Sequence, residues 1–92
     1  MLTKKEKEVI NKSAKKYNVS TIILFGSSLK QNSAKDIDLA VKGISPQLFF
    51  DFYGELFKGL SKTVDIIDID EVDIYFAKRI LEEGKIIYGP QI

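Results

Sequence analysis

The sequence predicts a small α/β (α+β) domain, in which a two-layer mixed sheet of about four strands is covered by helices. Short apolar runs rich in β-branched residues alternate with segments whose apolar residues recur at helical spacing. A short link joins the first two strand-like runs, which favours an antiparallel pair. A helical segment joins the second and third, which favours a parallel pair. The 92 residues are expected to form a single domain, 1–92.

Local signals define the elements in the first half of the chain. Thr3 and Glu6 form a capping box ahead of the first helix. The first strand is a continuous β-rich run, as expected of a central strand buried on both faces. A glycine then begins a turn, because it allows the backbone to change direction sharply. In order, we expect a helix over residues 4–17, a strand over 21–25, a turn over 26–30 and a strand over 35–41.

The second half contains two further helices and two strands. Ser45 and Pro46 suit the N-cap and the first residue of a long helix. The last helix is expected to begin at Asp70–Glu71, where the helix dipole favours acids, and to stop at Gly84. Its buried stripe is expected to consist of Ile74, Ala77, Ile80 and Leu81. The other elements expected are a helix over residues 48–60, a strand over 63–67 and a strand over 85–88.

The long helix carries more apolar side chains than one core-facing stripe needs. Phe50 and Phe57 fall beyond one edge of the stripe. Two explanations stay open. One is a broad core under a small sheet, and the other is a surface that contacts a partner protein, since small monomers rarely leave large apolar patches in water. The ordinary part of the stripe consists of Phe49, Phe52, Tyr53, Leu56 and Leu60.

The composition excludes several classes of chemistry and location. The chain has no cysteine and no histidine, so disulfides, the usual zinc sites, Ser-His-Asp triads and cysteine nucleophiles are excluded. No apolar run approaches the length of a membrane span, and the N-terminus lacks the apolar region of a signal peptide. We therefore expect a cytoplasmic protein whose chemistry depends on carboxylates, hydroxyls, lysine and bound metal.

Charge is unevenly distributed along the chain, although the net charge is only +1. Residues 1–35 contain eight lysines and two glutamates, a net +6, and residues 36–92 contain six cations and eleven acids, a net −5. A nucleic-acid-binding protein would be expected to show a larger basic excess with interleaved aromatics. The pattern argues against a nucleic-acid partner and suits a solvated basic helix.

Three acids and a Gly-Ser turn form the most informative group of residues. Asp36 and Asp38 alternate along one strand, so both side chains point to the same face. Asp65, expected on an adjacent central strand, would add a third carboxylate to the same side. Clustered carboxylates resist burial unless a cation lies between them, and magnesium prefers such oxygen ligands. The turn at Gly26 and Ser27 can offer backbone N–H groups and a hydroxyl to phosphate oxygens.

These motifs resemble the polymerase-β-like nucleotidyltransferase superfamily. The resemblance rests on Phe-Gly-Ser at residues 25–27, Asp-Ile-Asp-Leu at 36–39 and Val-Asp-Ile-Ile at 64–67. The closer likeness is to its minimal members, the MNT proteins, which typically end in a pattern like that of residues 83–89. The resemblance implies the nucleotidyltransferase fold and covers residues 20–89. One departure is the spacer between Ser27 and Asp36, which has eight residues instead of about ten.

The resemblance also implies roles for individual residues. Asp36 and Asp38 would ligate two Mg²⁺ ions, and Asp65 would ligate the catalytic ion and help to activate the attacking hydroxyl. The residues expected to bind the triphosphate of ATP are Gly26, Ser27, Ser28 and Lys30. Lys30 stands where the family usually has arginine, and a glutamine follows it where the family has glycine.

The expected activity is transfer of a nucleoside monophosphate, AMP from ATP, to a hydroxyl with release of pyrophosphate. Little chain remains to recognise an acceptor. The resemblance therefore implies a HEPN-type partner protein or a second copy of the chain, contacted through the helix that carries Phe50 and Phe57. An alternative is a non-catalytic, nucleotide-binding antitoxin that acts by binding its partner. A free-standing small-molecule adenylyltransferase is a third reading, but it would need an acceptor pocket.

Overall fold

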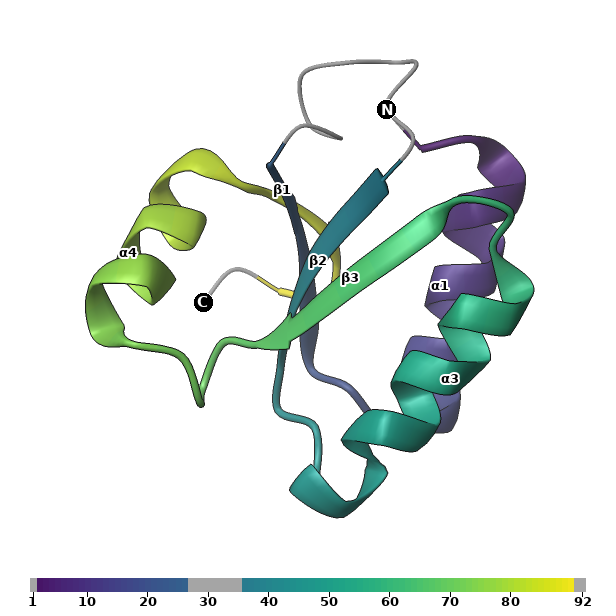
Figure 1. Ribbon diagram of the computed structural model, residues 1–92, viewed down its shortest axis with the longest axis horizontal. Coiled ribbons are helices and arrows are strands. Elements are labelled where there is room, and N and C mark those ends of the chain that lie inside the picture. The colour runs from purple at the N-terminus through teal and green to yellow at the C-terminus, as the bar shows by residue number, and fades with distance from the viewer. Residues whose placement is uncertain (1, 27–35, 91–92) are drawn as a thin grey trace.

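The computed structural model describes residues 2–26 and 36–90, which form one four-stranded mixed sheet with helices on both faces (Figure 1). No helix in these two ranges is long and apolar enough to span a membrane. The elements in chain order are α1 (Lys4–Lys16), β1 (Thr21–Phe25), β2 (Asp36–Lys42), the 3₁₀ turn η1 (Pro46–Leu48), α3 (Phe49–Gly59), β3 (Thr63–Asp68), α4 (Ile74–Glu83) and β4 (Lys85–Tyr88).

The sheet has the strand order β3-β2-β1-β4. β1 pairs antiparallel with both β2 and β4, and β2 pairs parallel with β3 across the helical crossover. These directions confirm the prediction made from the lengths of the connections. One expectation is wrong: β3, which carries Asp65, is an edge strand and not a central one, because β4 returns to the far side of β1.

Two apolar clusters lie on opposite faces of the sheet. α1 and α3 pack on the larger cluster, which contains the side chains of Leu24, Leu39 and Phe52. α4 packs on the smaller cluster, which contains Ile23 and Ile80, and Figure 1 shows this helix on the other side of the strands from α1 and α3. Alternation along β1 therefore gives this strand two apolar faces, as predicted for a buried central strand. On β2, the face toward α1 and α3 is apolar, and the other face carries Asp36 and Asp38 beside Ala40.

The two later helices begin at positions that differ from those predicted. Ser45 precedes η1, not the α-helix itself, and its side chain makes no capping hydrogen bond; α3 starts at Phe49. α4 starts at Ile74, because the Asp73 carboxylate accepts hydrogen bonds from the N–H groups of Tyr75 at 2.8 Å and Phe76 at 3.4 Å. The earlier start at Asp70–Glu71 is wrong.

The Asp70 carboxylate serves a different purpose from helix capping. It accepts hydrogen bonds from Lys42 Nζ at 2.8 Å and from the Gly43 N–H at 3.3 Å, and so fastens the segment after β3 to the end of β2. The predicted buried stripe of α4 is also only partly correct. Ile80 is buried and Ala77 half-buried, but the side chains of Ile74 and Leu81 are exposed. The helix is short and covers only part of the sheet face, so its ends extend beyond the core.

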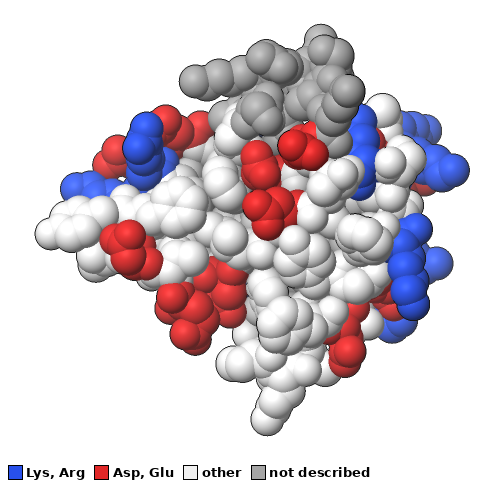
Figure 2. All heavy atoms as spheres, viewed as in Figure 1, with Lys and Arg blue, Asp and Glu red and all other residues white. Residues whose placement is uncertain are grey.

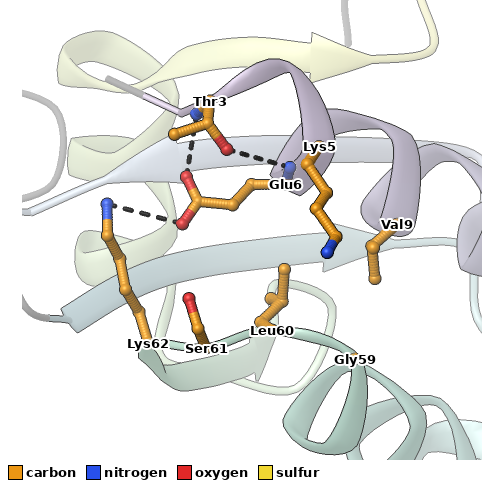
Figure 3. A pocket seen from close by; sticks show the side chains of 8 residues that line it. All are labelled: Thr3, Lys5, Glu6, Val9, Gly59, Leu60, Ser61 and Lys62. Atoms are coloured by element: carbon orange, nitrogen blue, oxygen red, sulfur yellow. Dashed lines mark hydrogen bonds and ion pairs between the residues drawn. The ribbon is translucent and has the colours of Figure 1, made fainter.

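Glu6 has a structural role at the start of α1. Its Oε1 accepts a hydrogen bond from the Thr3 N–H at 2.8 Å, and its own N–H donates to Thr3 Oγ1 at 3.1 Å, which confirms the predicted capping box. Its Oε2 lies 3.4 Å from Lys62 Nζ, just before β3 (Figure 3). The pocket drawn there has a volume of about 240 Å³. The Glu6 carboxylate in this pocket is buried and already contacts Thr3 and Lys62, which supports a structural role for Glu6.

The charge of Glu6 is expected to stabilise the fold above about pH 4.5. Burial alone would raise its pKa, but the Thr3 hydrogen bonds and the Lys62 charge outweigh burial and hold the pKa below the usual 4.5. Such a carboxyl contributes stability above its unfolded-state pKa and loses it as the pH falls through the folded-state pKa. Glu6→Gln should lower Tm at pH 7 by roughly 5 °C, or about 1 kcal/mol.

Thermal denaturation between pH 7 and pH 3 measures this effect. The difference between wild type and Glu6→Gln should shrink as the pH falls below 4.5. Glu8→Gln, at an exposed position of the same helix, is the matched control and should change Tm little. A Tm difference for Glu6→Gln that stays constant over the whole pH range would show that the side chain acts through packing alone.

Candidate active site

The register of two strands brings the three predicted acids to one face of the sheet. Asp38 lies directly opposite Asp65 in the parallel β2–β3 pair, and Asp36 lies two residues before Asp38 on the same strand. Because side chains alternate between the two faces along each strand, all three carboxylates lie on the face on which α4 packs, opposite α1 and α3. Figure 2 shows acidic side chains gathered near the centre of this view. The structure therefore brings together residues that are 27 or more positions apart in the sequence.

The electrostatics of this face centre on Asp38. Burial, followed by the neighbouring charges of Asp65 and Asp36, raises the pKa of the Asp38 carboxyl above its usual 3.8. In residues 2–26 and 36–90, no three acidic side chains are grouped closely enough to hold a metal ion as they stand. The donor set nevertheless fits a hard cation in its chemistry, since it offers carboxylate oxygens from two adjacent strands whose mutual repulsion a cation would relieve.

Gly26 lies against Asp38 at the end of β1. Its φ of +72° belongs to the left-handed region, which residues with a Cβ rarely adopt. A Cβ built on Gly26 would overlap Asp38 Oδ2. The glycine therefore permits a close approach of backbone to side chain. The other residues predicted to bind triphosphate, Ser27, Ser28 and Lys30, lie outside the described residues.

Tyr53 belongs to this site, although the sequence pattern assigned it only to the core stripe of its helix. Its hydroxyl donates to the Val64 carbonyl oxygen at 3.1 Å and to Asp65 Oδ1 at 3.3 Å. Burial, with the nearby Asp65 charge, raises the pKa of the Tyr53 hydroxyl, so it stays protonated and can donate. Because β3 is an edge strand, a side chain from α3 can reach around the edge to Asp65. In the sequence, only the hydroxyl group of Tyr53, which is unusual in an otherwise apolar core stripe, could have indicated that this residue reaches the acidic site.

Phe50 and Phe57 lie on the outer surface of α3, with residue exposures of 79% and 63%. Of the two explanations offered by the sequence, the broad core is wrong, and contact with a partner protein stays a prediction. The predicted core stripe is confirmed, since Phe52, Leu56 and Leu60 are buried and Phe49 and Tyr53 pack half-buried against the same core. This surface lies on the side of the sheet opposite the three acids, with the β3 edge and Tyr53 between them.

Comparison with known protein families gives a match that covers nearly the whole chain. The family described as Polymerase beta, Nucleotidyltransferase matches residues 7–91. No curated protein matches the chain.

Solved structures match the fold closely at low sequence identity. A toxin–antitoxin structure with AMP-PNP is 23% identical, with a TM-score of 0.77 over 92% of this chain and 74% of that one. A complex of a tri-AMPylated Shewanella oneidensis HEPN toxin with an MNT antitoxin is 23% identical, with a TM-score of 0.72 over 94% and 71%. A further structure from Shewanella oneidensis is 19% identical, with a TM-score of 0.76 over 98% and 75%. The nucleotidyltransferase fold implied by the motifs is thereby confirmed.

Proposed function

Because this chain belongs to the polymerase β nucleotidyltransferase family, we propose that it is a magnesium-dependent enzyme that transfers AMP from ATP to a hydroxyl of a HEPN-type partner protein. The observation that carries the proposal is the convergence of Asp36, Asp38 and Asp65 on one face, with the backbone of Gly26 packed against Asp38. Carboxylates beside a glycine turn are the groups needed to hold a metal-bound triphosphate.

In the proposed reaction, the acceptor oxygen attacks the α-phosphorus of ATP. A new P–O bond forms, the bond to the bridging oxygen between the α- and β-phosphates breaks, and pyrophosphate leaves with that electron pair. Asp65 would orient the acceptor hydroxyl and take its proton, while the Tyr53 hydroxyl bond fixes the position of the Asp65 carboxylate. Asp36 and Asp38 would hold Mg²⁺, which when bound supplies charge neutralisation.

The rest of the proposed donor site is the turn after β1. Gly26, Ser27, Ser28 and Lys30 would bind the triphosphate through backbone N–H groups, hydroxyls and one cationic side chain. The close approach of Gly26 to Asp38 supports this placement, because phosphates held at the turn would lie beside the metal-binding carboxylates.

Two of the similar structures support the proposal, one for a HEPN-type partner and the other for an adenine nucleotide as the donor. One contains an AMPylated HEPN toxin with an MNT antitoxin, and another contains AMP-PNP. In this chain, a partner bound to the outer surface of α3 would sit on the side of the sheet away from the acids. The acceptor hydroxyl would then approach across the β3 edge, where Tyr53 of α3 meets Asp65.

A second candidate function is a non-catalytic antitoxin that acts by binding and masking its partner. The observation that favours it is the separation of the exposed Phe50 and Phe57 from the acidic face, since a masking surface needs no chemistry at Asp38.

One experiment separates the two candidates. The chain is incubated with magnesium, ATP labelled on the α-phosphate and the HEPN-type protein. Transfer of label to the HEPN-type protein, with release of pyrophosphate, is the expected result. A stable complex that forms without any transfer of label would instead favour masking, and a chain that neither binds the protein nor labels it would overturn both candidates.

The exposed aromatics of α3 are expected to contribute to the partner interface. Replacing Phe50 and Phe57 together by serine should weaken binding of the HEPN-type protein at least about tenfold, since buried aromatic anchors commonly supply much of an interface's energy. The change should leave Tm and ATP binding unaffected, because both side chains are exposed and lie away from the acids.

Size-exclusion chromatography with light scattering and titration calorimetry measure the association. The matched control replaces Ile74 and Tyr75 by serine, two similarly exposed apolar residues on α4. Equal weakening by both double variants would show that α3 has no special part in the interface. Unfolding of the Phe50/Phe57 variant would show that the two rings support the core.

A further inference from the structure

A pocket of about 180 Å³ lies between the end of β1 and the adjacent face of α4, on the same side of the sheet as the acids. It is too small for a whole nucleotide, because sites that enclose small molecules typically have volumes of roughly 300–1,000 Å³. It is lined by the side chains or backbone of Phe25, Gly26, Phe76, Arg79, Ile80 and Glu83. We refer to it as the Phe25–Phe76 pocket.

The Phe25–Phe76 pocket adjoins the acidic site through two neighbours. Gly26 lines the pocket and also lies against the Asp38 carboxylate. Phe25 lies directly opposite Asp38 in the antiparallel β1–β2 pair, so the two side chains share a face. A ligand with its charged part at Asp38 therefore has the pocket immediately beside it.

The pocket walls combine aromatic rings with a polar rim. The rings of Phe25 and Phe76 meet edge to face with centroids 6.1 Å apart, and 40% of Phe76 is exposed. At the rim, Arg79 Nε donates to Glu83 Oε2 at 2.9 Å, and both side chains remain largely exposed. A flat ligand ring with hydrogen-bond donors and acceptors along its edge fits these surroundings. The phenylalanine side chains would contact the face of the ligand ring, and the Arg79–Glu83 pair would lie at its edge.

We infer that the Phe25–Phe76 pocket binds the nucleobase of the triphosphate whose phosphates lie at Gly26 and Asp38. The inference rests on the proposed function and adds to it the part of the chain that contacts the base. Phe76 supplies the main stacking surface, and Arg79 and Glu83 supply polar groups for the base edge. The acidic site would then hold the phosphates of the ligand, and the pocket at α4 would hold the base of the same ligand.

The test compares two ligands that differ in the base. Dissociation constants are measured for Mg²⁺ with ATP and for Mg²⁺ with inorganic tripolyphosphate, which has no base. Phe76→Ala should weaken ATP binding about tenfold, the loss expected from removing one base–aromatic contact, and should leave tripolyphosphate binding unchanged. Tyr75→Ala is the matched control, since Tyr75 is the neighbouring aromatic of α4, is 83% exposed and does not line the pocket. It should change neither constant.

Phe76→Leu keeps apolar bulk on the helix and provides a second, milder variant. It should show the same selective loss for ATP, smaller in size. Unchanged ATP binding in both Phe76 variants, or equal weakening of ATP and tripolyphosphate, would overturn the base assignment while the wild-type protein still binds both ligands. A wild-type protein that binds neither ligand would overturn the proposed function, and the base assignment with it.

Discussion

Replacing Asp36 and Asp38 together by asparagine is expected to abolish the stabilisation that magnesium and ATP give the protein. At a ligand concentration of about 100 times Kd, the wild-type protein should gain about 2.7 kcal/mol, or roughly 10–20 °C in Tm. The gain requires a cation held by the carboxylates of β2, and asparagine removes their charge while keeping their shape. Differential scanning fluorimetry with and without Mg²⁺ and ATP measures the gain, and excess EDTA should remove it from the wild type.

The ligand-free double variant is expected to be at least as stable as the wild-type protein. Asp38 is partly buried beside Asp36 and Asp65, so removing two of the three like charges relieves repulsion. The matched control carries Asp51→Asn and Glu71→Gln, which remove the same charge from exposed positions elsewhere. It should keep the full response to ligand. An undiminished rise in Tm for the Asp36/Asp38 variant would show that these residues do not hold the metal-bound nucleotide.

Adding a single methyl group at Gly26 is expected to have the next largest effect. Gly26→Ala places a Cβ on the Asp38 carboxylate and forces an alanine into a φ of +72°. The backbone strain should cost about 1–2 kcal/mol, or roughly 5–15 °C in Tm. The displaced Asp38 carboxylate should also weaken binding of Mg²⁺ with ATP by at least about tenfold, equivalent to about 1.4 kcal/mol. Titration calorimetry on the folded variant measures the second effect separately from the first.

Gly43 offers a closely matched control for this substitution. It follows β2 at the other end of the strand, has a φ of +80°, and a Cβ there would overlap the Ser20 side chain. Gly43→Ala should therefore lower Tm by a similar amount and leave ATP binding unchanged. Similar loss of ATP affinity in both variants would mean that destabilisation alone explains the effect of Gly26→Ala. Unchanged affinity in Gly26→Ala would remove Gly26 from the phosphate site.

Much of the fold could be predicted from the sequence because it depends on local patterns. The first strand and the last strand have the bounds that their apolar runs predicted, and the capping box at Thr3 begins α1 as expected. The shared face of Asp36 and Asp38 also follows from the sequence, since side chains two residues apart on a strand must point the same way. These features are set by backbone geometry over a few neighbouring residues.

The predicted start and apolar stripe of α4 failed for a different reason. Asp70 and Asp73 are equally suitable caps when read locally, and only the position of Lys42 and Gly43 makes Asp70 a tether between strands. Ile74 lies at the end of a short helix, beyond the sheet surface that buries Ile80. Helical spacing gives the angle of a side chain around its own axis, but not the extent of the surface it faces.

The sequence by itself determined which chemical groups this protein has and which of them share a strand face: the acids of β2, the glycine turn and the aromatic-rich helix. Only the tertiary structure decided that Asp65 pairs with Asp38 from an edge strand, that Tyr53 reaches it around that edge, and that Phe50 and Phe57 lie exposed on the opposite side. The reason is that strand pairing and side-chain burial depend on contacts between segments far apart in the chain. Local periodicity specifies the face on which a side chain lies, but not which segment packs against that face.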